Sequence, residues 1–95
     1  MGYAIERNYV ETGKTLAIFR RRVNLSQREV GQYLGYSSAQ FISNIEAGIQ
    51  FVPIEKLKKL TKLYGMKPDY IINIYFQEER KRMYKIMGIK CSNPS

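Results

Sequence analysis

The chain of 95 residues contains no histidine and a single cysteine, Cys91. One cysteine cannot form an internal disulfide, and without histidine partners it cannot build a zinc cluster. No apolar run approaches the roughly 18 residues of a membrane-spanning helix. The first ten residues also lack the apolar core of a signal peptide. These absences predict a cytoplasmic protein with no disulfide, no bound metal and no membrane span.

Acidic residues are also scarce, because 8 Asp and Glu stand against 16 Lys and Arg and leave a formal net charge of +8. Such an excess favours a polyanionic partner, with nucleic acid the first candidate and an anionic membrane the second. The sequence also contains no Gly-rich phosphate-binding loop, in addition to having no histidine and no metal cluster. The composition therefore indicates a binding protein that is not an enzyme and uses no cofactor.

Apolar residues recur at helical spacing along most of the chain, which predicts an all-α domain of five helices with an extended C-terminal helix. Thr12 is the predicted cap of the first helix. Glu78 and Arg82 are spaced for an ion pair within one helix, which favours a last helix that continues across the polar stretch. The predicted divisions are an N-terminal arm (1–11), the helical domain (12–76), a C-terminal helical extension (77–90) and a tail (91–95).

Two short helices are predicted in the middle of the chain. Ser26 and Glu29 form the capping-box pattern that begins the first of them. Ser37 or Ser38 is the predicted cap of the second, which runs to Ala47. Helices of about eight residues are not stable alone, so they need the other helices behind them. Two short helices joined by a Gly-containing turn are the plan of a helix-turn-helix.

The second short helix has an apolar face and a polar face. Its polar residues recur at helical spacing, and the stretch 34–48 has no Lys or Arg. Gln and Asn side chains can hydrogen bond bidentately to adenine, whereas Ser is an adaptable partner and Ala leaves room for a thymine methyl. This chemistry favours a helix that reads base edges in the DNA major groove. The polar face consists of Gln40, Ser43, Asn44 and Ala47.

The motif LSQREVGQYLG…FISNIEAG (25–48) resembles the lambda-repressor-like, Cro/XRE-type helix-turn-helix DNA-binding family. The likeness extends from Gly13 to LKKLTKLYGMKPDYII (57–72) and covers about two-thirds of the chain. Two differences stand out. The stretch between Gly35 and Ile42 is one residue longer than the commonest pattern, and Gly31 replaces the usual alanine.

The resemblance implies a role for several residues. Gln40 and Asn44, with Ala39 and Ser43 beside them, match base-reading positions. Gln27 resembles a residue that contacts a phosphate, and Ser38 and Lys56 are further phosphate candidates because of their position and charge. In addition, the resemblance implies a structural ion pair of Arg20 and Glu46.

Two apolar segments lie outside this motif. The loop 49–52 is either tucked under the domain or part of a partner surface. The patch of Met83, Tyr84, Ile86 and Met87 lies beyond a polar gap, which favours a dimer contact over a frayed amphipathic tail. The favoured function is a sequence-specific regulator that binds double-stranded DNA, a homodimeric repressor of phage or mobile-element type. The alternative is an antitoxin or other module that binds a protein partner.

Overall fold

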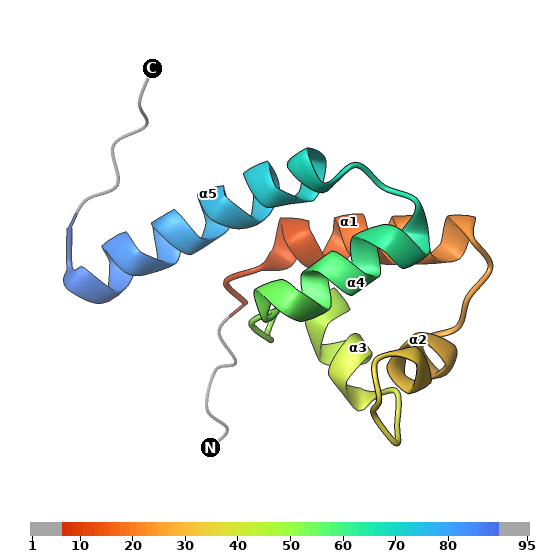
Figure 1. Cartoon of the computed structure of the whole chain (residues 1–95). Helices are drawn as coiled ribbons and strands as arrows, with labels where there is room; N and C mark the ends of the chain where they lie inside the picture. The colour runs from red at the N-terminus through yellow and green to blue at the C-terminus, as the bar shows by residue number, and fades with distance from the viewer. Residues whose placement is uncertain (1–6, 90–95) are drawn as a thin grey trace.

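The computed structural model describes residues 7–89, and within them it contains five α-helices and no strand (Figure 1). This confirms the predicted all-α fold. The predicted arm and tail lie mostly outside the described residues. The helices are α1 (Val10–Arg22), α2 (Gln27–Tyr33), α3 (Gln40–Glu46), α4 (Ile54–Tyr64) and α5 (Pro68–Met87).

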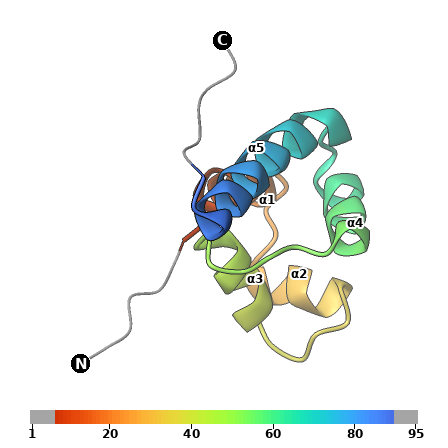
Figure 2. The ribbon, with the colours of Figure 1, turned by 90° about the vertical axis from the view of Figure 1, so that its left-hand side faces the viewer.

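The helices form two groups that enclose one core. α1, α4 and the first half of α5 lie together, and α2 and α3 lie beneath them in both views (Figures 1 and 2). The core receives apolar side chains from every helix, because each one presents a stripe at helical spacing. The fully buried members of this core are Leu16, Val30, Ile42, Ile45, Val52, Leu57, Leu60 and Ile71.

The start of α1 differs from the prediction. The helix begins at Val10, and Thr12 is a fully buried residue of its first turn. The expected cap was wrong because the Thr12 hydroxyl donates to Glu78 of α5 at 2.6 Å, a long-range contact that local sequence does not reveal. At the other end, Asn24 follows α1 in the left-handed region, with a φ of 58°. Asn is one of the residues that tolerate this conformation at the end of a helix.

The capping box of α2 is confirmed. The Glu29 amide donates to Ser26 Oγ at 3.0 Å, and the Ser26 amide donates to Glu29 Oε1 at 2.9 Å. The Ser26 amide and hydroxyl lower the pKa of the Glu29 carboxyl, because both stabilise its charged form. α2 therefore begins where the local pattern placed it.

α5 is continuous across the polar stretch, but not for the predicted reason. Glu78 contacts α1, and Arg82 pairs with Glu79 at 2.7 Å, so the expected Glu78–Arg82 pair is wrong. In the first half of the helix, the side chains of Ile71 and Tyr75 are buried in the core. From residue 76 to residue 89 no side chain is buried. The second half of α5 therefore extends beyond the other helices (Figure 1).

The sequence left open whether the apolar loop between α3 and α4 is tucked under the domain or part of a partner surface. In the structure, part of the loop is buried and part is exposed. Val52 is fully buried, and its amide and carbonyl both bond the Tyr75 hydroxyl at 2.9 Å. Burial raises the pKa of Tyr75 to about 12, so the hydroxyl keeps the proton that it donates to Val52. Phe51 remains 49% exposed. The loop is thus anchored on α5 and still presents one aromatic ring to the surface.

Candidate nucleic-acid interface

α3 lies with α2 on the side of the molecule away from α5, below α1 and α4 (Figures 1 and 2). Ile42 and Ile45 bury one side of the helix, and α1 approaches its C-terminal end closely. A Cβ atom at Gly13 would lie 2.4 Å from the Ile45 carbonyl oxygen, so only glycine fits at this crossing. This close contact fixes α3 against α1 and leaves the opposite side of α3 at the surface.

The turn before α3 contains the extra residue, and Gly31 accommodates it. A Cβ atom at position 31 would lie 2.6 Å from the Ser38 carbonyl oxygen. The two differences from the commonest family pattern are thus connected, because the longer turn passes over α2 where a side chain would stand. The expected serine cap was wrong, since Ala39 is the N-cap and α3 begins at Gln40. Ser38 Oγ instead accepts from the Gln40 amide at 3.3 Å.

Gln40 and Asn44 lie one helical turn apart and are hydrogen bonded to each other. Gln40 Nε2 donates to Asn44 Oδ1 at 2.8 Å. Gln40 is exposed, whereas Asn44, Ser43 and Ala39 are partly exposed. This bond uses neither the amide N–H groups of Asn44 nor the carbonyl oxygen of Gln40. The side of α3 that faces solvent therefore offers both donors and acceptors from side chains held in one arrangement.

Glu46, at the C-terminal end of α3, joins three helices. It accepts from Arg20 Nε at 2.6 Å and from Arg20 Nη2 at 3.0 Å. It also accepts from Gln27 Nε2 at 2.9 Å. The hydrogen bonds to the Glu46 carboxylate raise the pKa of the Arg20 guanidinium, which also donates to the Leu25 carbonyl at 2.7 Å. The Gln27 amide thus makes a hydrogen bond inside the protein, which the sequence did not predict.

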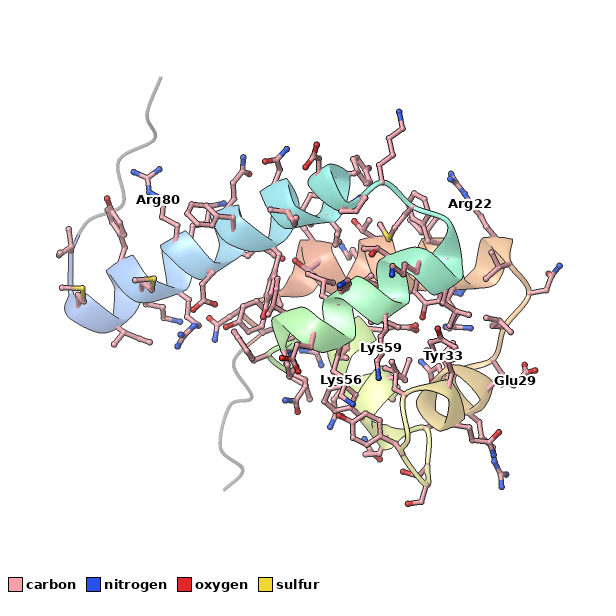
Figure 3. The ribbon with its side chains drawn as sticks, viewed as in Figure 1. Arg22, Glu29, Tyr33, Lys56, Lys59 and Arg80 are labelled. Carbon is pink, nitrogen blue, oxygen red and sulfur yellow. The ribbon has the colours of Figure 1, made fainter. Side chains whose placement is uncertain are left out.

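Lys56 of α4 also has an internal contact. Its ammonium donates to the Leu34 carbonyl at 3.1 Å and lies 5.2 Å from the centre of the Tyr36 ring. Tyr36 in turn stacks on Phe41 of α3, with ring centres 4.3 Å apart. Lys56 lies on the side of α4 that faces α2 (Figure 3). The contacts show it bridging α4 and the helix-turn-helix.

A cleft of about 490 Å³ lies between α1 and the helix-turn-helix. Two cations from α1, Lys14 and Arg21, line it together with Gln27 and Ser43. Neither Lys14 nor Arg21 was predicted from the sequence as a phosphate contact. The spacing of seven between them, with Ala17 and Ile18 in between, was the available signal, because it places both cations on one side of α1.

The patch at the end of α5 is remote from this region (Figure 1). Ile86 and Met87 are 68% and 69% exposed, and Met83 is also exposed. Tyr84 is partly exposed, and Arg80 lies over its ring at 5.2 Å. Arg80 points away from the other helices (Figure 3). The described residues of the chain leave this apolar patch uncovered.

A family model described as a helix-turn-helix domain matches residues 11–70. The chain belongs to this helix-turn-helix family. The match confirms the resemblance seen in the sequence, and it indicates a DNA-binding regulator. No curated protein and no solved structure matches the chain.

Two further properties concern the described residues alone. Within residues 7–89, no helix has the length and apolar character needed to cross a membrane. The same range contains no group of three or more His, Cys, Asp or Glu side chains placed to hold a metal ion.

Proposed function

We propose that this helix-turn-helix protein is a sequence-specific regulator that binds double-stranded DNA, most simply a repressor that occludes a promoter. The observation that carries the proposal is the hydrogen-bonded pair of Gln40 and Asn44 on the solvent side of α3. None of the exposed large apolar side chains of the described residues lies on α3. A polar helix surface of this kind suits base edges better than it suits a protein interface.

The proposed base reader is an amide pair that is already ordered. Asn44 can accept from adenine N6 through the second lone pair of its Oδ1 and donate to N7 through its amide nitrogen. The bond from Gln40 holds that amide in place, which lowers the entropy lost on binding. Ser43 and Ala39 adjoin the pair. We therefore expect adenine-containing half-sites.

Phosphate contacts are proposed along the cleft between α1 and α3. Lys14 and Arg21 supply its positive charge, and Gln27 lies on its wall. Gln27 still has a second N–H and its carbonyl oxygen after bonding Glu46, so a phosphate contact needs no loss of the internal bond. Ser38 and Lys56 remain candidates at the edges of the motif. Lys56 would have to share or exchange its bond to Leu34.

We also propose that the regulator is a homodimer. The exposed side chains Ile72, Phe76, Met83 and Met87 follow one another at intervals of four, seven and four, so they share one side of α5. Together with Ile86 they form an exposed apolar surface on one helix, and contiguous apolar patches on single proteins mark interaction sites. Two-fold pairing would place two copies of α3 on two half-sites.

Salt dependence tests the nucleic-acid proposal. A cognate duplex is first obtained by selection from random DNA. We expect log K for that duplex to fall steeply and linearly with log salt, because phosphates dominate the affinity. Lys14→Ala should reduce the slope by about 1 and weaken cognate and random DNA alike. Lys67→Ala, which removes an exposed cation near the start of α5, is the matched control. An affinity that does not change with salt would exclude the proposal.

A second candidate function is an antitoxin or another protein-binding module. It is favoured by an apolar groove of about 220 Å³ between the α3–α4 loop and α5, lined by Phe51, Ile54, Ile72 and Phe76 among others. A gene for a small toxin beside this one would support it. Co-expression of the two proteins, followed by purification of one through a tag on the other, provides the direct test. The regulator of phage or mobile-element type remains our first proposal.

A further inference from the structure

The first turn of α1 lies between the end of α3 and the middle of α5. On the α3 side, the Tyr9 amide donates to the Gly48 carbonyl at 2.9 Å. Gly48 directly follows the C-cap of α3, so this bond connects the start of α1 to the end of the proposed reading helix. Where α1 crosses the end of α3 at Gly13, the two backbones lie too close to admit a side chain, so the helices cannot slide past each other there.

On the α5 side, Glu78 caps α1. Its Oε2 accepts from the Glu11 amide at 2.8 Å, and its Oε1 accepts from the Thr12 amide at 2.8 Å and the Thr12 hydroxyl at 2.6 Å. α1 has no side-chain cap of its own. A carboxylate is favoured at the N-terminus of a helix, where amides lack partners and the helix dipole is positive. An acid from α5 therefore satisfies the first turn of α1.

Tyr9 completes the connection. Its hydroxyl donates to Glu79 Oε2 at 2.6 Å, and Arg82 donates to the other oxygen of the same carboxylate at 2.7 Å. The ring of Tyr9 packs edge-on against Tyr75, with centres 5.3 Å apart. We define the α1–α5 joint as Tyr9, Thr12, Tyr75, Glu78 and Glu79. Beyond Tyr75 no described side chain of α5 is buried, so the hydrogen bonds of the joint add to the core contacts of Ile71 and Tyr75 in holding this helix.

We propose that the α1–α5 joint sets the orientation of α3 relative to the C-terminal extension of α5, and that Tyr9 and Glu78 are positioning residues for paired half-sites. The inference rests on the proposed function, because it concerns how two copies paired through α5 would place their reading helices. A joint made of directional hydrogen bonds holds an angle, whereas apolar contact alone would allow sliding. The distance between the two α3 helices, and hence the accepted half-site spacing, depends on that angle.

The test compares binding to single half-sites with binding to paired half-sites at several spacings. For the unmodified protein we expect one spacing to be preferred by roughly tenfold or more over spacings two base pairs away, since dimer geometry fixes half-site separation. Tyr9→Phe combined with Glu78→Gln removes the hydroxyl bond and weakens the cap while it preserves both shapes. This variant should bind all spacings within about threefold of one another and keep its single half-site affinity.

One further pair of variants and one charge control make the result specific. Thr12→Val removes one hydroxyl from the joint and should flatten the spacing preference partly, whereas Thr12→Ser keeps the hydroxyl and should restore it. Asp69→Asn changes the net charge as Glu78→Gln does, at an exposed position in the first turn of α5, and should leave the preference intact. If the double variant does not fold, the Thr12 pair decides the question.

The contrary outcomes are distinct. A preserved spacing preference in the double variant and in Thr12→Val would overturn the inference. So would a flat profile for the unmodified protein, or an equal loss of affinity on single and paired half-sites, which indicates a merely structural role. Failure of the proposed function is separate, because it appears as equal binding of a single cognate half-site and random DNA.

Discussion

The two ends of α1 are each held by carboxylates from another helix, and the two joints differ in burial. At the C-terminal end, the Arg20 and Glu46 side chains are only 10% and 7% exposed. At the N-terminal end, the Glu78 and Glu79 carboxylates that bond Thr12 and Tyr9 are only partly buried, and the Glu79 side chain is 25% exposed. A buried charge that loses its partner is costly, whereas water and salt screen an exposed pair. The comparison indicates that removing the Glu46 carboxylate costs more stability than removing the carboxylate of Glu78 or Glu79.

The largest expected effect is the loss of the buried joint. Glu46→Ala leaves the Arg20 guanidinium buried without its carboxylate and removes the partner of Gln27. We expect the free energy of unfolding to fall by about 3 kcal/mol, which for a chain of this size lowers Tm by roughly 15 °C. Thermal unfolding followed by circular dichroism measures it. Glu55→Ala, at an exposed acid of α4, is the control and should stay within about 0.5 kcal/mol.

A change at the far end of α5 should leave folding intact and alter assembly. Ile86→Asp places a charge in the exposed patch, so we expect self-association to weaken by tenfold or more, about 1.4 kcal/mol, with unchanged thermal unfolding. Sedimentation velocity over a range of concentrations measures it. Ile18→Asp makes the same replacement at an exposed isoleucine of α1 and should not affect association. If both variants associate as the unmodified protein does, the patch is not the interface.

The smallest effect concerns pH at the α1–α5 joint. Arg82, and then the Tyr9 hydroxyl, lower the pKa of Glu79 below its ordinary value despite partial desolvation. The charged carboxylate therefore contributes stability above the ordinary Glu pKa, and this contribution is lost as the pH falls through the lowered value. Glu79→Gln should make the drop in unfolding temperature between pH 7 and pH 3 smaller. Asp69→Asn should reduce that drop less than Glu79→Gln does.

The elements that the sequence predicted correctly have local causes. The capping box of Ser26 and Glu29 and the apolar stripes depend on residues a few positions apart. These patterns predicted the number of helices and the helix-turn-helix at their centre. The family resemblance also implied the Arg20–Glu46 pair, which the structure contains.

The elements that the sequence did not predict depend on contacts between distant segments. Thr12 resembles a cap until Glu78, 66 residues away, is seen to bond it. α3 begins later than predicted because the longer turn crosses Gly31. The internal hydrogen bonds of Gln27 and Lys56 arise from the packing of neighbouring helices. Lys14 was missed because its spacing of seven from Arg21 marks one side of α1 but does not show that this side borders the cleft beside α3.

The central claim, that α3 reads bases through its amide pair, is tested most directly by the ratio of cognate to random DNA affinity. Asn44→Ala and Gln40→Ala should each cost about 1–3 kcal/mol on the cognate duplex, with little change on random DNA and in thermal unfolding. The double variant should cost less than the sum, because the two amides share a bond. Gln77→Ala, at an exposed amide of α5, should retain the full ratio. An equal loss on both DNAs, or no loss on either, would contradict the account.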